Sequence, residues 1–190
     1  MENEADKTNE TADEAGGVAD PTAAIVDQWK RERPDLDPTP MLVVGRLFAL
    51  TGVLDQRLRP PFAEAGLGNG DFDVLAALRR SGEPYALSAG ELSRTVLVTT
   101  GAVTKRVDRL EARGLVSRSV AAHDSRGRLV TLTAEGVELA DTLIATHLAN
   151  QRRLLAGLDD RSQAQLADLL GRLATTLAAG EGAAGVEAEG

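Results

Sequence analysis

The chain is 190 residues long and acidic, with a formal net charge of -8. Acidity of this degree, taken over the whole chain, argues against a nucleic-acid partner. The chain has no cysteine, which excludes a thiol redox sensor and a cysteine-based metal site. Because no segment suits a membrane span and the first twenty residues lack a signal-peptide core, the sequence predicts a cytoplasmic protein without membrane contact.

The charge is unevenly distributed along the chain. Residues 1–20 hold seven acidic groups and one lysine, and residues 180–190 hold three glutamates and no base, so the other 159 residues have a net charge of +1. Both tails have few large apolar groups to offset the entropy lost on ordering, so we expect both to be disordered. Between residues 88 and 131 there are eight Lys or Arg and only four acidic residues. This basic balance favours contact with phosphates.

Two helical segments are expected after the first tail, within residues 21–66. Residues 22–33 have their apolar side chains on one side, among them the only tryptophan, Trp29, which is typical of an extra helix docked on the body. Residues 40–65 form a longer apolar-rich segment. Two prolines, the first of them Pro60, should kink this segment or end its first half.

Residues 67–133 predict a winged helix-turn-helix. Ser88 and Glu91 have the spacing of a capping box that starts a helix running to about residue 96. After a turn, residues 99–113 carry an apolar stripe at helical period, and a glycine follows as a C-cap. Two β-branched runs, residues 115–120 and 128–133, surround a polar loop and predict a hairpin. This order of elements indicates binding to double-stranded DNA.

The second helix of this motif has a polar face opposite its apolar stripe, and the hairpin loop carries an arginine. In this motif the helix enters the major groove, and a basic wing tip can reach a minor groove. The alternative for the helix is an ordinary solvated face, and for the wing an exposed ion pair. The residues predicted to contact DNA are Ser88, Thr99, Thr100, Gly101, Thr104, Lys105, Arg109, Asp124, Arg126 and Arg128.

Residues 134–179 predict two further helices. Thr133 caps the first, which runs to about residue 156, and Asp159 caps a leucine-rich second one that ends near residue 179. Together they have more apolar surface than one small domain would cover, so we expect them to pack against a second copy in a homodimer. The alternative is that they close a core within one chain. The predicted fold is mainly α with a small β-hairpin wing, flanked by N- and C-terminal dimerisation helices.

Five segments in this order resemble the MarR family of bacterial transcription regulators. They are Phe72–Leu75, Gly90–Ser93, Val103–Val116, Asp124–Arg126 and Leu132–Gly136. The resemblance extends over roughly residues 40 to 178. It implies a ligand-responsive repressor of its own and a neighbouring gene, acting on a pseudopalindromic operator. The wing departs from the family pattern, because a serine and a glycine flank Arg126 where many members have consecutive arginines.

One charged residue of the second helix predicts a sensing function. Arg106 is about 40 degrees around the helix from Leu110, on its buried edge, where a guanidinium needs an anionic partner. Asp73, in the otherwise apolar segment 72–78, is the candidate. A structural ion pair between the two is one interpretation.

The other interpretation comes from a resemblance to the urate-responsive branch of the MarR family. It implies a ligand-binding pocket formed by Trp29, Asp73, Arg106 and Arg118, and a planar anionic effector. Other members respond to tricarboxylates such as citrate or trans-aconitate, and arginine forks suit both kinds of anion. A ligand that displaced Asp73 from Arg106 would rotate the second helix and weaken DNA binding.

The sequence also bears on two other classes of function. An enzyme is not expected, because the chain has no Gly-rich phosphate loop, only two histidines, His123 and His147, and no metal-spaced group. We predict no cofactor, and we expect His147 to be a surface or interface group. A winged helix used only for protein contacts is the remaining alternative.

Overall fold

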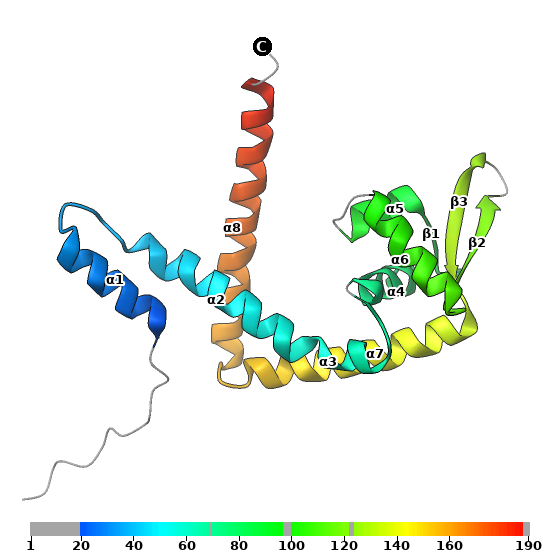
Figure 1. Cartoon of the computed structure of the whole chain (residues 1–190), viewed down its shortest axis with the longest axis horizontal. Coiled ribbons are helices and arrows are strands. Elements are labelled where there is room, and N and C mark those ends of the chain that lie inside the picture. Colours follow the sequence, from blue (N-terminus) through cyan, green and yellow to red (C-terminus); the bar gives the residue numbers. More distant parts are fainter. Residues whose placement is uncertain (1–19, 69, 97–99, 122–123, 188–190) are drawn as a thin grey trace, which may run out of the picture. The chain divides into compact units, whose positions relative to one another are not determined.

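The computed structural model describes residues 20–68, 70–96, 100–121 and 124–187 (Figure 1). The chain divides into two compact units, one ending at Leu54 and one beginning at Asp55. Each unit is described by itself below. The predicted disorder of residues 1–19 and 188–190 concerns parts of the chain outside the described residues.

The first unit contains α1 (Pro21–Glu32) and most of α2 (Pro40–Leu58). Asp20 caps α1 by accepting from the backbone N–H of Thr22, and its carboxylate also accepts from Arg46 Nη2 of α2 at 2.6 Å. That arginine holds the pKa of Asp20 below its usual value. A Cβ on Gly45 would lie 2.8 Å from Thr22 Cγ2, so the glycine permits close packing of α1 on α2. The predicted extra N-terminal helix is therefore present.

The second unit begins with the end of α2 and continues through α3 (Pro60–Glu64) and α4 (Asp71–Arg80). The helix predicted over residues 40–65 is thus divided in two, with the break immediately before Pro60. Proline cannot donate the backbone hydrogen bond that would continue α2, which explains the break.

The winged helix-turn-helix is confirmed and has one strand more than predicted. Its elements are β1 (Ala86–Ser88), α5 (Ala89–Thr95), α6 (Thr100–Ala112), β2 (Val116–Ala121) and β3 (Asp124–Leu132). The strands form an antiparallel sheet in the order β1-β3-β2. Leu87 of β1 pairs with Val130 of β3, and Arg118 of β2 pairs with the same residue from the other side.

The core of this lobe comes from α4, α5, α6 and the sheet, together with Ala140 and Leu143 of the helix that follows the sheet. The stripe on α6 is buried as predicted, and it meets the buried leucines of α4 and α5. The fully buried side chains of this lobe are Val74, Leu75, Leu78, Leu92, Val103, Val107 and Leu110. The capping box is also present, since Ser88 N–H donates to Glu91 Oε2 at 2.7 Å and Glu91 N–H donates to Ser88 Oγ at 3.2 Å.

Two long helices follow the sheet, α7 (Ala134–Leu155) and α8 (Asp160–Glu187). Thr133 caps α7 as predicted, accepting from Gly136 N–H at 3.0 Å. The prediction ended the last helix near residue 179 and made the rest a disordered tail. That boundary was wrong, because α8 continues to residue 187; alanine, which favours helix, is frequent in this stretch.

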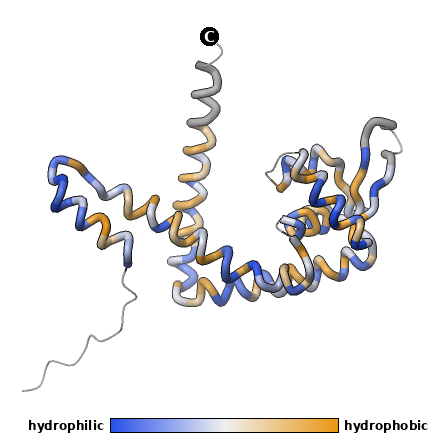
Figure 2. Tube along the Cα trace, viewed as in Figure 1, coloured by the Kyte–Doolittle hydropathy of each residue, from blue (hydrophilic) through white to orange (hydrophobic). Residues whose placement is uncertain are grey.

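Apolar residues recur along α2 and α8 (Figure 2), yet many of their side chains are exposed. No residue of α2 is buried, and Phe48 is 78% exposed. On α8, Leu169 is 58% exposed, and Leu166, Leu170 and Leu177 are also exposed. Within the described ranges, no helix is long and apolar enough to cross a bilayer.

Candidate nucleic-acid interface

The outer face of α6 is the part of the lobe most suited to DNA. Val103, Val107 and Leu110 anchor the opposite side of the helix in the core, so the outer side is presented to solvent. Lys105 is exposed there, and a Cβ built on Gly101 meets no atom of the described residues within 4 Å. Both residues therefore lie where the sequence predicted a DNA-facing surface.

The structure describes only some of the side chains of the other residues that were predicted to contact DNA. Thr104 and Arg128 are exposed, and the hydroxyl of Ser88 is already engaged in capping α5. For Thr100, Asp124 and Arg126 only the backbone is described, in α6 and β3. Thr99 lies outside the described residues. These contacts remain predictions.

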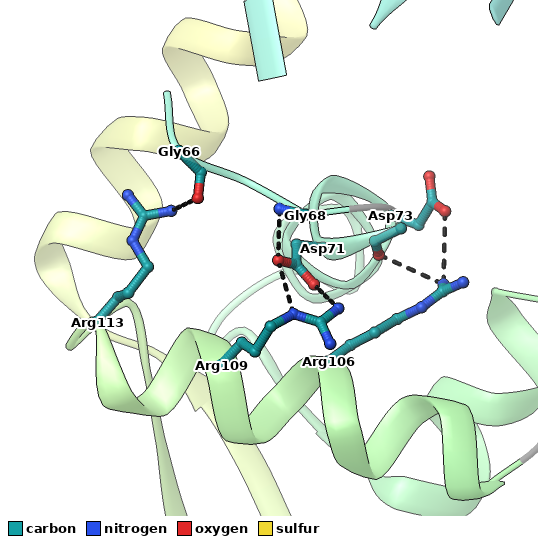
Figure 3. A network of polar contacts seen from close by, with 8 residues as sticks. Gly66, Gly68, Asp71, Asp73, Arg106, Arg109 and Arg113 are labelled. Carbon is teal, nitrogen blue, oxygen red and sulfur yellow. Dashed lines mark hydrogen bonds and ion pairs between the residues drawn. The ribbon is translucent and has the colours of Figure 1, made fainter. Parts of the chain in front are cut away.

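Arg109 differs from its predicted role as a free cation on the DNA face. Its guanidinium binds the Asp71 carboxylate, with Nη2 2.5 Å from Oδ1 and Nε 3.3 Å from Oδ2 (Figure 3). Asp71 is only 2% exposed, and its Oδ2 also accepts from Gly68 N–H at 2.8 Å. Sequence analysis missed Asp71, whose partner is 38 residues further along the chain.

Two further arginines lie on the same side of α6 as Arg109. Arg113 donates to the carbonyls of Gly66 and Ala65, each at 2.8 Å. Arg106 donates to the Gly70 carbonyl at 3.3 Å. Arginines three and four positions apart share one face of a helix. This arginine face, defined as Arg106, Arg109 and Arg113, therefore binds neighbouring protein groups (Figure 3), although Arg109 and Arg113 also remain exposed to solvent.

The predicted contact between Arg106 and Asp73 is present. Arg106 Nη1 is 3.6 Å from Asp73 Oδ2, and the arginine side chain is 17% exposed. Asp73 was expected to lie in apolar surroundings, but its side chain is 58% exposed. The pair therefore consists of a mostly buried guanidinium and a carboxylate that water can reach.

The structure does not bring Arg118 to this pair. Arg118 of β2 bonds to Asp108 at 2.5 Å and to Glu111, both on α6. These two acids are about 160 and 140 degrees around the helix from Arg106, on its other side. Trp29, the fourth residue of the predicted pocket, belongs to the first unit. Of the four predicted ligand-binding residues, the structure shows only Asp73 and Arg106 in contact.

A cavity of about 410 Å³ lies between α4, α5 and α7. Its lining is Phe72, Asp73, Ala76, Arg80, Thr95, Val96, Ile144 and His147. The His147 ring packs against Phe62 and Phe72, with centroids 5.4 and 5.5 Å away, and the residue is partly buried, so the expected surface or interface position stays a prediction. Burial lowers the pKa of His147, while the nearby Asp73 charge opposes that shift. Across the described part of the chain, no group of His, Asp and Glu could hold a metal ion.

The fold and this surface define a winged helix-turn-helix protein. The chain belongs to the MarR family of transcriptional regulators: residues 65–127 match the family's sequence profile. It is 38% identical to the HTH-type transcriptional regulator PecS of Dickeya dadantii over 149 residues, which cover 78% of this chain and 90% of PecS.

Two other proteins extend the comparison. The chain is 30% identical to the HTH-type transcriptional repressor MdtR of Bacillus subtilis, over 64% of this chain and 79% of MdtR. Among solved structures, Sco3205, a MarR family regulator from Streptomyces coelicolor in complex with DNA, superposes with a TM-score of 0.68 at 25% identity, covering 75% of this chain and 93% of Sco3205. These relatives are regulators and not enzymes, in agreement with the sequence-based expectation.

Proposed function

We propose that this chain is a homodimeric transcriptional repressor that binds a pseudopalindromic operator and represses its own gene. The observation that carries this proposal is the outer face of α6, where Lys105 and Gly101 are open to a partner beside a basic wing. Sco3205 was solved with DNA and MdtR is named a repressor, which supports the same activity here.

The dimer follows from the exposed apolar side chains of α2 and α8. Large apolar patches on a soluble protein mark an interaction surface. A second copy would cover both helices and would supply the second α6 that a two-fold operator requires. The two half-sites would then be about one helical turn of DNA apart.

Binding to a labelled duplex from upstream of the chain's own coding sequence tests the DNA part of the proposal. The expected result is tight binding that weakens steeply as salt is raised, because neutralised phosphates release counterions. A duplex of scrambled sequence should bind less tightly at every salt concentration. Equal binding to both duplexes, or none at moderate salt, would contradict the proposal and favour a winged helix used for protein contacts.

We further propose that a small organic anion, urate-like or a tricarboxylate such as citrate or trans-aconitate, binds Arg106 in place of Asp73. The 3.6 Å separation and the exposure of Asp73 favour exchange of one anion for another. Since Arg106 belongs to α6, such an exchange would rotate this helix, which is the proposed DNA-binding helix. A ligand that binds the DNA-incompetent state about 100-fold more tightly shifts the equilibrium by at most about 2.7 kcal/mol.

Release of the operator duplex by urate, citrate or trans-aconitate tests the effector. We expect one of these anions to displace the chain at saturating concentration and the Arg106→Ala variant to bind DNA without responding. Arg31→Ala, which removes an exposed arginine of α1, should respond normally. A full response in Arg106→Ala would rule this site out. Quenching of the single Trp29 in the same titration tests its predicted role.

A further inference from the structure

We infer that Asp71 and Arg109 are a positioning pair, which sets the DNA-binding helix α6 against the segment that leads into α4. The inference rests on the proposed function. It adds the two residues that hold α6, the proposed DNA-binding helix, in position. In this role neither residue contacts DNA, in contrast to the contact that the sequence predicted for Arg109.

The geometry of the pair is that of a buried bidentate contact. Both carboxylate oxygens of Asp71 accept from the Arg109 guanidinium, and Oδ2 also accepts from Gly68 N–H. Asp71 is almost completely buried, whereas the Arg109 side chain is 48% exposed. Removing one partner from a buried ion pair leaves an uncompensated charge, so such a pair strongly favours a single geometry.

The surrounding residues make the contact between α6 and this segment specific. The neighbouring arginines of the same face bind the carbonyls of Ala65, Gly66 and Gly70. A Cβ on Gly68 would lie 3.0 Å from Asp71 Oδ2 and 3.3 Å from Arg109 Nε. The arginine face of α6 therefore contacts the chain between α3 and α4 at several points, and its acidic partner at the start of α4, Asp71, is buried.

The charge of Arg109 is the reason for assigning it to positioning and not to DNA contact. Hydrogen bonding to Asp71 raises the pKa of Arg109, so the guanidinium stays charged, and that charge is directed at the Asp71 carboxylate. A guanidinium paired with a carboxylate contributes little to phosphate binding. Lys105 is about 40 degrees further around the helix and is exposed, so it is the matched direct-contact residue.

The test compares four variants on an operator that the wild-type chain selects from randomised duplexes. Asp71→Asn keeps the size of the side chain and removes its charge, and Arg109→Gln removes the opposite partner. Lys105→Gln is the control for a direct phosphate contact. Asp141→Asn breaks an exposed bidentate contact with Arg79 that does not involve α6, and serves as the neutral control.

Two readouts separate positioning from contact. Lys105→Gln should reduce the slope of log affinity against log salt by about 1.8, the value for two lost phosphate contacts, because each chain of the dimer loses one. Asp71→Asn and Arg109→Gln should each weaken binding about tenfold with an unchanged slope. The double variant should bind no more weakly than either single variant, because both act through one contact.

A second series of duplexes, with the half-sites moved one base pair closer or further apart, detects a merely structural role. Loss of stability alone would lower the active fraction equally on every duplex. A positioning role predicts that Asp71→Asn loses the preference for the selected spacing, while Asp141→Asn keeps it. If Asp71→Asn shows no cooperative unfolding, Arg109→Lys, which keeps the charge but not the fork, is measured in its place with the same expectation.

The inference is overturned if Arg109→Gln reduces the salt slope while Asp71→Asn binds as tightly as wild type, because Arg109 would then contact DNA directly. Wild-type affinity and spacing preference in both variants would also overturn it. Failure of the wild-type chain to select any duplex would contradict the proposed function itself and the inference with it. That result is distinguishable, because it precedes any comparison of variants.

Discussion

The lobe built from α4, α5, α6 and the sheet buries its large apolar side chains, whereas α2 and α8 leave theirs exposed. Leu75 and Leu110 are inaccessible to solvent, but Phe48 and Leu169 are among the most exposed apolar residues of the chain. The lobe thus has a buried core of its own, to which Ala140 and Leu143 of α7 also belong. The helices α2 and α8, which come before and after the lobe in the sequence, are as rich in apolar residues as a core, but these residues are exposed. They therefore need a partner that the single chain does not provide.

The largest expected effect is on the lobe. Leu75→Ala should lower the free energy of unfolding by about 2–5 kcal/mol, because it leaves a cavity in a close-packed core. Chemical denaturation followed by circular dichroism measures this loss. The loss caused by Leu75→Ala should be the same at every protein concentration. Leu169→Ala should lower the free energy of unfolding only over the range of protein concentration in which the chain self-associates. Equal losses in the free energy of unfolding, independent of protein concentration in both variants, would contradict this difference between the lobe and α8.

A charge on α8 should weaken self-association without changing the stability of the lobe. Leu169→Arg places a charge on the exposed leucine face and should weaken self-association about 30-fold or more, the effect of losing a hot-spot residue. Sedimentation velocity over a dilution series measures it. Thr175→Arg adds the same charge on another side of α8 and should associate like wild type. Identical behaviour of the two variants would exclude the leucine face as the interface.

The backbone of the lobe is more constrained than that of α8. Gly70 has a φ of +77°, and a Cβ there would lie 2.1 Å from Arg106 Cζ. We expect Gly70→Ala to lower the free energy of unfolding by about 1–3 kcal/mol through backbone strain and displacement of Arg106. Gly171→Ala, in open space on α8, should raise helix stability slightly. Thermal unfolding of both variants checks the contrast, and a stable Gly70→Ala would contradict it.

The smallest expected effect is a dependence of stability on pH. Burial lowers the pKa of His147 below 6.5, while Asp73, which lines the same cavity as His147 and Arg80, opposes the shift. The unfolded chain therefore binds a proton more readily than the folded one. The contribution of neutral His147 to the free energy of unfolding is fully present above about pH 6.5. It decreases as the pH falls toward the lowered pKa of His147 in the folded chain. His147→Leu should flatten this part of the stability curve, and an unchanged curve would show that His147 does not cause it.

Local sequence signals predicted the elements of the lobe well. The capping box at Ser88, the stripe on α6 and the cap at Thr133 depend on residues a few positions apart, and each is present. The strand β1 was missed because three residues carry no period of their own. Its existence depends on pairing with β3 more than forty residues away.

The candidate site was predicted only in part for a similar reason. A helical wheel identified Arg106 as a buried cation, and its contact with Asp73 is present. The wheel placed Arg109 on the polar face opposite the apolar stripe, and it could not show that the buried Asp71 of another helix would bind it. A signal was nevertheless available: three arginines recur on one face of a helix, which is unusual for a face that has no acidic partner of its own.

The most direct test of this account is the mass of the chain in solution, free and bound to its selected operator, measured by sedimentation equilibrium. The account predicts a free species of twice the 20.0 kDa chain mass at micromolar concentration, and two chains on each duplex. A monomer that binds one chain per duplex would contradict it, because the exposed faces of α2 and α8 would then have no second copy to cover them.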